Sequence, residues 1–163
     1  MKEVPATRSA LATFCDDVRL EVGNKMSYVG IYQGTLLLTS LPTTLPKLCV
    51  VITARTPHSN PFRELKFELF RGNDELLLSQ VLPDVPPVQS PSLESLEYKG
   101  GERIDSYTTI MQLVGFPVTS DLMLRTVVTT EGEMYRAGSL AIQRLPDQPE
   151  PTAPPDVSRV AKV

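Results

Sequence analysis

Residues 14–32 read FCDDVRLEVGNKMSYVGIY, and this stretch has the pattern of a β-hairpin. The apolar side chains at even positions share one face, which we expect to lie against a core: Phe14, Val18, Leu20 and Val22. The side chains at odd positions share the other face: Cys15, Asp17, Arg19 and Glu21. Gly23 and Asn24 tolerate positive φ, so we assign them the structural role of closing the turn. The sequence therefore predicts a hairpin with one buried and one exposed face.

The rest of the chain repeats this pattern of short apolar runs separated by Gly, Asn or Pro. Further strands are expected at 35–39, 47–55, 62–69, 75–82, 104–116, 122–130 and 134–144. The run 47–55 is apolar on both faces over its middle, which is typical of a central, covered strand. Seven to nine strands without a helical period between them indicate an all-β fold, an antiparallel β-sandwich, with a β-barrel as the alternative.

Composition divides the chain into three segments. Residues 1–10 form an N-terminal arm, residues 11–145 form the β-sandwich domain, and residues 146–163 form an extended Pro-rich tail. A chain of 163 residues fits one domain and buries roughly 70% of its unfolded surface, so we expect one core without support from a metal or a disulfide. Within the domain, residues 83–92 are too rich in proline for a sheet and are expected to form a long loop.

Charge and hydropathy limit the partners and the location of this chain. The formal net charge of −3 argues against general affinity for nucleic acid or an anionic membrane, because both depend on clustered Lys and Arg. No apolar run approaches the roughly 20 residues of a membrane-spanning helix, and the amino terminus has no apolar signal region, so we expect a cytoplasmic protein. Cys15 and Cys49 are expected to be reduced thiols in or near the core, with a disulfide or a reactive cysteine as the alternative.

Residues with catalytic or metal-binding chemistry are few in this sequence. His58 is the only histidine and is expected to be a solvated loop side chain, so a site built from several histidines is excluded. No P-loop, dinucleotide fingerprint, zincin helix or nucleophile elbow occurs. We therefore predict a non-enzymatic protein with no catalytic residue, no cofactor and no metal.

Asp16 and Asp17 are the best candidates for the alternative, a small hydrolase or a metal-dependent enzyme. Paired carboxylates can act as acid and base or hold a divalent cation. Adjacent strand residues point to opposite faces, however, so the two carboxylates converge only at a bulge. The preferred interpretation gives Asp16 a structural role: it lies on the apolar face and is paired or hydrogen-bonded there, whereas Asp17 is solvated.

The tail is the main candidate for partner binding. Its prolines fix an extended course at low entropy cost, and its last residues supply a small apolar anchor. The residues that we assign to partner binding are Pro149, Pro151, Pro154, Pro155, Val157, Val160 and Val163. A disordered solubilising tail is the alternative. Four tyrosines serve either core packing or a partner surface: Tyr28, Tyr32, Tyr107 and Tyr135.

The run Phe14-Cys15-Asp16-Asp17, followed by Gly23-Asn24-Lys25 and Gly30-Ile31-Tyr32, resembles an uncharacterised family of small bacterial and phage proteins that open with a similar hairpin. The resemblance covers the amino-terminal part of the chain. It implies a β-rich domain from a bacterium or its virus, without an activity, a cofactor or a catalytic residue. We therefore expect a structural or protein-interaction module that binds sister subunits or another protein, such as a virion accessory or decoration component. A soluble binding module that acts on a host or regulatory protein is the alternative.

Overall fold

The structure, a computed structural model, describes residues 7–86 and 103–146. These two segments contain nine strands: β1 (Ser9–Glu21), β2 (Lys25–Ile31), β3 (Thr35–Leu38), β4 (Thr43–Pro57), β5 (Leu65–Arg71), β6 (Glu75–Leu82), β7 (Ile104–Val118), β8 (Leu122–Thr130) and β9 (Glu133–Arg144). Within the described residues there is no helix, and hence none that could cross a membrane. The all-β prediction is confirmed.

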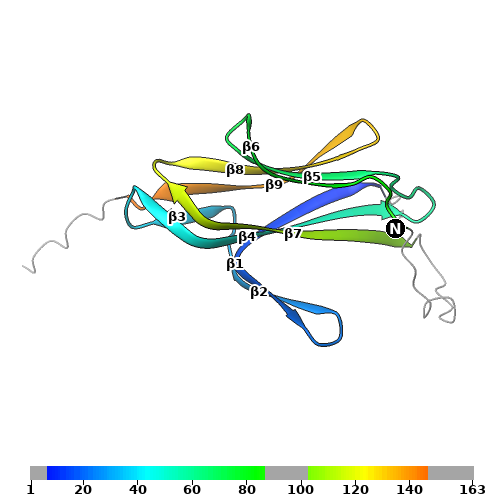
Figure 1. Cartoon of the computed structure of the whole chain (residues 1–163), viewed down its shortest axis with the longest axis horizontal. Coiled ribbons are helices and arrows are strands. Elements are labelled where there is room, and N and C mark those ends of the chain that lie inside the picture. Colours follow the sequence, from blue (N-terminus) through cyan, green and yellow to red (C-terminus); the bar gives the residue numbers. More distant parts are fainter. Residues whose placement is uncertain (1–6, 87–102, 147–163) are drawn as a thin grey trace, which may run out of the picture.

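The strands form two sheets that lie face to face. The first sheet has the order β2-β1-β4-β7 and the second has the order β3-β9-β8-β5-β6. In Figure 1, β4 and β7 lie in the lower layer, and β5, β8 and β9 lie in the upper layer. The two sheets do not join into a closed barrel, so the sandwich prediction is confirmed and the barrel alternative is not.

One strand pair departs from the antiparallel prediction. β3 pairs with β9 in parallel, from Thr35 opposite Ala141 to Leu38 opposite Arg144. The chain reaches this position by crossing from the first sheet, where β2 lies, to the edge of the second sheet. The amide of Ala141 donates to the carbonyl of Gly34 at 2.9 Å, so the pairing begins as soon as the chain arrives.

The core lies between the two sheets and confirms the alternation that the sequence predicts. The largest fully buried side chains from both sheets include Leu48, Val50, Ile52, Leu65, Phe67, Leu69, Leu124, Leu140 and Ile142. On the other face of β4, Cys49 is 0% exposed and Val51 is 2% exposed. β4 is therefore a central strand that is covered on both faces, as its apolar run predicts.

Several element boundaries differ from the prediction; β5, for example, is Leu65–Arg71 rather than 62–69, and β7 continues to Val118. β4 begins at Thr43 and includes Pro46, although proline has no amide to donate to a sheet. β1 pairs with β4 only from Cys49 to Arg55, so the part of β4 that holds Pro46 has a partner strand on one side alone. A proline is tolerated on such an unpaired side. β1 begins at Ser9, so the last two residues of the expected N-terminal arm already belong to the sheet.

Candidate functional site

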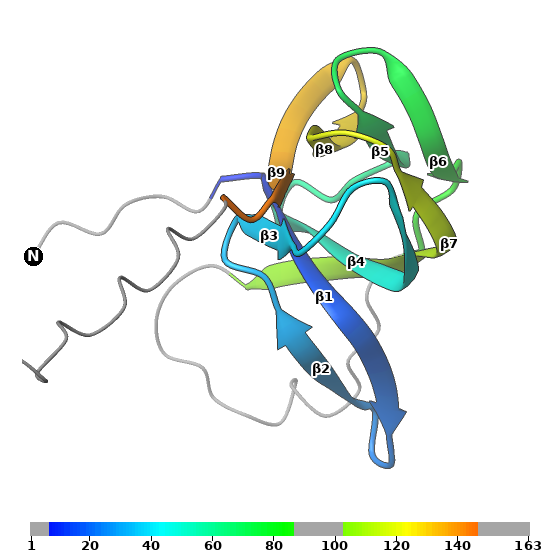
Figure 2. The ribbon, with the colours of Figure 1, turned by 90° about the vertical axis from the view of Figure 1, so that its left-hand side faces the viewer.

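The hairpin of β1 and β2 leaves the body of the sandwich. β1 pairs with β4 from Ser9 to Cys15 and with β2 from Cys15 to Glu21, so the strand changes partners at Cys15. Beyond this residue β2 is the only described strand beside β1, and Figures 1 and 2 show both strands projecting from the two layers. We call residues 16–31 the projecting hairpin. Its turn has positive φ at Gly23 (80°) and Asn24 (57°), as predicted.

One face of the projecting hairpin is apolar. The register places Val18 opposite Tyr28 and Leu20 opposite Met26. Alternation puts these four side chains on the face of β1 that directs Phe14 into the core. The hairpin therefore continues the core face of the first sheet. We call the four side chains of this face, together with Val22 in the turn that follows β1, the apolar stripe: Val18, Leu20, Val22, Met26 and Tyr28.

The distal part of the apolar stripe lacks the cover that the same face has inside the body, whereas Val18 and Tyr28 at its base are half-buried. Phe14 is 3% exposed, whereas Leu20 is 78% exposed and Val22 is 94% exposed. The prediction that Leu20 and Val22 lie against a core is therefore wrong. The physical reason is that β1, with 13 residues, runs past the second sheet (Figure 2). Strand length does not indicate this, because β4 and β7 have 15 residues each and pair with one another along their lengths.

The opposite face of the hairpin carries most of its charges, together with the exposed side chains of Val29 (40%) and Ile31 (54%). Glu21 accepts a hydrogen bond from the hydroxyl of Ser27 at 3.0 Å, and Arg19 Nε lies 3.7 Å from Asp17 Oδ2. Lys25 lies directly opposite Glu21 in the β1–β2 register. The apolar stripe contains no charged side chain, although the exposed Asp16 lies on the same face at its base.

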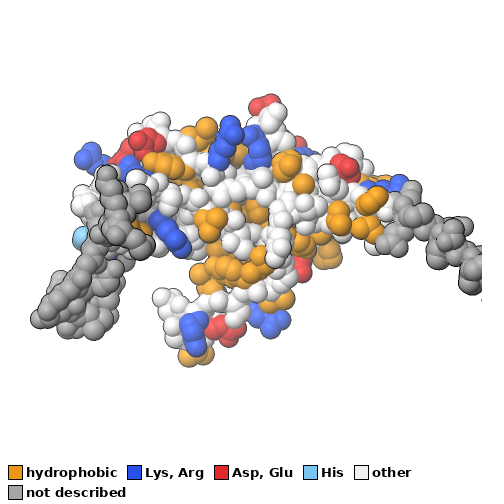
Figure 3. Space-filling model, turned by 180° about the vertical axis from the view of Figure 1, so that it is seen from behind, with side chains coloured by type: hydrophobic (Ala, Val, Ile, Leu, Met, Phe, Trp, Pro, Cys, Tyr) orange, Lys and Arg blue, Asp and Glu red, His pale blue; other side chains and the backbone are white. Residues whose placement is uncertain are grey.

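A hollow of about 460 Å³ separates the tip of the hairpin from the outer face of β7. It is lined from both sides by Leu20, Glu21, Asn24, Lys25, Met26, Ser106, Thr108 and Ile110. Figure 3 shows the hairpin standing away from the body, with hydrophobic side chains on the body beside the gap. Leu20 and Met26 therefore lie opposite the outer face of β7 across this hollow.

Asp16 secures the root of the hairpin on the apolar side. Its carboxylate accepts a hydrogen bond from the Tyr32 hydroxyl, and it lies so close over Gly30 that a Cβ there would be 1.9 Å from Asp16 Oδ2. Gly30 has φ +66°, so the position requires glycine for its conformation as well. Burial, with the hydrogen bond to Asp16 as a further cause, raises the pKa of Tyr32. A hydrogen-bonded Asp16 confirms one part of the prediction, but the residue is exposed rather than set among apolar neighbours.

Asp17 secures the other side of the root. Its Oδ1 lies 2.5 Å from Lys47 Nζ on β4, and this hydrogen bond is the main cause that lowers the pKa of Asp17. The same bond is the main cause that raises the pKa of Lys47. Asp17 is half-buried and paired across strands, so the prediction that it is only solvated is wrong. Asp16 and Asp17 point to opposite faces and have different partners, so they do not converge on one substrate.

The two cysteines form the last residue pair between β1 and β4 before the hairpin leaves the body. Cys15 lies opposite Cys49 in the β1–β4 register, and both are free thiols with 0% exposure. Burial raises the pKa of Cys15 to about 11, with Cys49 as a further cause. Burial is also the main cause that raises the pKa of Cys49. The prediction of buried thiols is confirmed, and the structure joins them by no disulfide. Protonated, buried thiols are poor nucleophiles.

His58 is held more firmly than a solvated loop residue. Its Nδ1 lies 2.8 Å from Oδ2 of Asp105, and its backbone amide donates to the carbonyl of Arg103 at 2.8 Å. Asp105 is 2% exposed and also lies 3.1 Å from Arg103 Nε. The histidine ring is about half exposed. These contacts fasten the loop after β4 to the start of β7.

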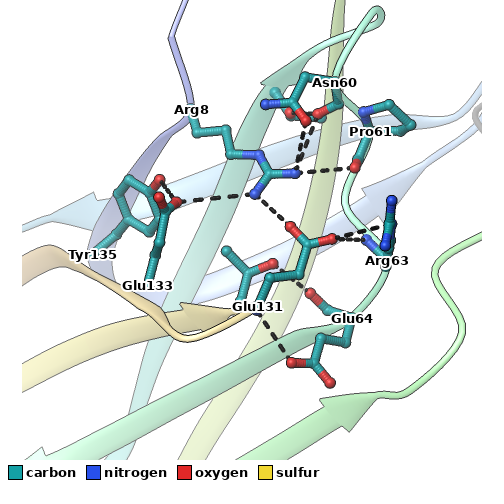
Figure 4. A network of polar contacts seen from close by, with 10 residues as sticks. Arg8, Asn60, Pro61, Arg63, Glu64, Glu131, Glu133 and Tyr135 are labelled. Atoms are coloured by element: carbon teal, nitrogen blue, oxygen red, sulfur yellow. Dashed lines mark hydrogen bonds and ion pairs between the residues drawn. The ribbon is translucent and has the colours of Figure 1, made fainter.

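A second polar network joins the start of β1 to the far end of the second sheet (Figure 4). Arg8 binds Glu131 at 2.5 Å and donates to the carbonyl of Pro61 at 3.0 Å. Its guanidinium also lies over the ring of Phe62, 4.9 Å from the centroid. The Arg8 side chain is only 11% exposed, so this cation is committed to holding the loops together. Sequence patterns give no signal for such a contact between distant loops.

The remaining candidates fall partly outside the described residues. All seven tail residues assigned to partner binding lie beyond residue 146. Tyr32, Tyr107 and Tyr135 pack against the core, whereas Tyr28 belongs to the apolar stripe. Among the described residues, no group of three or more His, Cys, Asp or Glu side chains could hold a metal ion.

Comparison with known proteins adds no assignment. No protein-family model matches the chain, and no curated protein is similar to it. The resemblance of the opening hairpin to small bacterial and phage proteins therefore stays a prediction. The apolar stripe of the projecting hairpin is the feature of the described chain that most needs a functional explanation.

Proposed function

We propose that this chain is a non-enzymatic structural or protein-interaction module and that the projecting hairpin is its binding element. The observation that carries the proposal is the exposure of Leu20 (78%), on a face that is buried elsewhere in the same strand, and of Val22 (94%) in the adjoining turn. Exposed single apolar residues are common on proteins, but a row of them that continues a core face is typical of an interaction surface.

Burial of these exposed side chains in a complex would favour association. Full burial of one Leu or Val side chain is worth about 1.5–3 kcal/mol, so covering Leu20 and Val22 would contribute several kcal/mol to a complex. The root contacts of Asp16 with Tyr32 and of Asp17 with Lys47 hold the hairpin in place. A partner therefore meets an ordered surface, which reduces the entropy lost on binding.

Two settings fit such a module. One is an accessory or decoration component of a virus particle, in which the hairpin contacts sister subunits or the particle surface. The other is a soluble protein of the bacterial cytoplasm that binds a host or regulatory protein. The alternative of an enzyme that uses Asp16 and Asp17 has less support, because the two carboxylates point to opposite faces and are already hydrogen-bonded.

The test compares the native chain with a Leu20→Asp, Val22→Asp double variant in an extract of the cells that make it. We expect the native chain to run in complexes larger than its own 18.0 kDa mass and the variant to run at the monomer mass. The variant should keep the melting midpoint of the native chain, because neither side chain is buried. Equal complex sizes for the two proteins would contradict the proposal.

A further inference from the structure

We propose that a hollow on the outer face of the second sheet is a binding site for one phosphate group. The hollow has a volume of about 220 Å³ and is lined by residues of β8 and β9: Arg125, Thr126, Val127, Arg136, Gly138 and Ser139. The proposal goes beyond the proposed function and does not depend on it, because the projecting hairpin belongs to the first sheet.

The strand pairing brings two arginines to the same face. Arg125 lies opposite Ser139, and Val127 lies opposite Arg136, with a register shift between Thr126 and Val127. Residues opposite each other in an antiparallel pair share a face, as do residues two apart along a strand. Four side chains of the hollow therefore form one outward patch, on the face of β8 that points away from the core. Both arginines can reach a ligand seated on this patch.

Arg125 supplies a fixed positive charge. Its Nε donates to the carbonyl of Gly72 at 2.6 Å, and its Nη2 donates to the carbonyl of Asn73 at 2.5 Å, both in the turn between β5 and β6. Neutral carbonyl groups orient the guanidinium, but they do not cancel its charge. Among the described residues, no carboxylate forms an ion pair with Arg125. Because the side chain is half-buried, an anion beside it is screened less by water than at an exposed site.

Arg136 supplies a second charge on a more adaptable side chain. It is exposed, and it forms no ion pair or hydrogen bond within the described part of the chain. Ser139 adds a hydroxyl group to the same hollow. An anion would therefore meet one guanidinium that is held in place, one that is free to close on it, and one hydroxyl donor.

The surroundings leave this positive charge uncompensated. None of the described residues that line the hollow is acidic. Glu68 on the adjacent strand β5 lies opposite Val127, but its carboxylate lies 2.7 Å from the ammonium group of Lys66. In a chain with a formal net charge of −3, two arginines in one hollow without an acidic neighbour make a local site for an anion.

Charge and size favour a phosphate group over a carboxylate or a large ligand. A phosphate monoester carries about −1.5 to −2 charges at pH 7 and three acceptor oxygens, which suits two guanidinium groups and a hydroxyl. The planar guanidinium can bind two such oxygens at once. The volume is below the roughly 300–1,000 Å³ of pockets for drug-sized ligands, so the hollow takes the phosphate group itself.

NMR titration of the purified full chain with sodium phosphate tests the proposal at about pH 7.5, where a phosphate group is mostly doubly charged. Sodium chloride keeps the ionic strength constant. We expect the amide signals of residues 125–127 and 136–139 to shift and to saturate, with a dissociation constant on the order of 1 mM.

Two arginine variants separate a specific site from general attraction. Arg136→Gln should weaken phosphate binding at least 10-fold, because it removes one of the two charges, and it should keep the fold because the side chain is exposed. The matched control is Arg55→Gln on β4, which removes the same charge from an exposed position of the first sheet. It should bind phosphate like the native chain.

Glycerol phosphate and acetate identify the ligand. Equal affinity for glycerol phosphate and inorganic phosphate would support a site for a phosphate monoester, and affinity for inorganic phosphate alone would support a site for the free ion. Acetate that binds as tightly as phosphate would overturn the assignment to phosphate.

Three results would overturn the site itself. They are shifts that do not saturate by about 20 mM phosphate, native affinity in Arg136→Gln, or an equal loss of affinity in Arg136→Gln and Arg55→Gln. None of these proteins changes the projecting hairpin, so failure of this proposal leaves the proposed function in place. Failure of the hairpin experiment likewise leaves the phosphate site in place.

Discussion

The two halves of β1 have the same alternation of apolar and polar side chains but differ in the exposure of the apolar ones. In the body half, from Ser9 to Cys15, the inward residue Phe14 is 3% exposed. In the hairpin half, Leu20 continues the same face and is 78% exposed. The alternation of apolar and polar side chains is the same on both sides of Cys15, but the second sheet covers only the residues before it. Alternation in a sequence therefore shows which face of a strand is apolar, but not whether the same chain covers that face.

The largest effect should come from the body, where the face is covered. Phe67→Ala removes a side chain that is 0% exposed between the sheets, so it should lower the free energy of unfolding by about 3–5 kcal/mol. Urea unfolding followed by circular dichroism measures this. A loss below about 1 kcal/mol, the range of exposed sites, would mean that the two sheets do not enclose a packed core.

The root of the hairpin should show an intermediate effect. Gly30→Ala places a Cβ 1.9 Å from Asp16 Oδ2 at a φ of +66°, so we expect a loss of about 1–3 kcal/mol. In an Asp16→Ala background, the same substitution should cost less, because only the backbone strain and a looser contact are left. Gly34→Ala is the control, since its φ is +88° and no atom lies within 4 Å of its Cβ position.

Equal costs for Gly30→Ala in the two backgrounds would contradict the contact between Asp16 and Gly30. A cost that matches Gly34→Ala in both backgrounds would show that backbone strain alone acts there. Either result would mean that the contact between Asp16 and Gly30 does not hold the hairpin in place.

A smaller effect is expected at the junction of the two halves. The pKa of Cys15 is raised from 9.0 to about 11, so at pH 8 about 100-fold less of it is thiolate than of an unperturbed cysteine. Reaction with a thiol reagent should be slower by at least this factor in the native protein than in urea, because the side chain is also 0% exposed. Reaction of both thiols at the unfolded rate would show that the junction opens freely.

The same pKa sets the sign of a stability change. The unfolded thiol ionises near pH 9 and the native thiol near pH 11, so the unfolded state releases its proton first. The stabilising contribution is complete below pH 9 and is lost as the pH rises towards 11. A Cys15→Ala variant should lack this part of the decline when unfolding is measured at pH 8 and pH 10.5.

The smallest effect on stability should come from the apolar stripe. Val22 is 94% exposed, so Val22→Ser should change the free energy of unfolding of the dilute protein by no more than about 0.5 kcal/mol. Chemical denaturation at low protein concentration measures this. A loss of about 2 kcal/mol, as expected for a buried valine, would place Val22 in the core after all.

Much of the body could be predicted from the sequence because its alternation and its turns are local properties. Gly23 and Asn24 close the turn as expected, and the apolar run of β4 is covered on both faces. The exposure of Leu20 could not be predicted, because it depends on where a distant sheet ends. The pairs Asp17–Lys47 and Arg8–Glu131 also join residues far apart in sequence, so no local pattern reports them.

The parallel pairing of β3 with β9 shows the same limit. Residues 35–38 have strand character in the sequence, but their partner is decided by the crossing of the chain between sheets. Local pattern specifies elements and faces, whereas partners and cover are properties of the whole fold.

Amide hydrogen exchange of the purified native chain tests the central claim most directly. The tip of the projecting hairpin has exposed side chains, so the amides of residues 16–31 should exchange by local opening. The amides of Val50 and Ile52 in the body should exchange far more slowly, because both residues are 0% exposed. Hairpin amides that are as protected as those of the body would contradict the claim that the second sheet covers only the body half of β1.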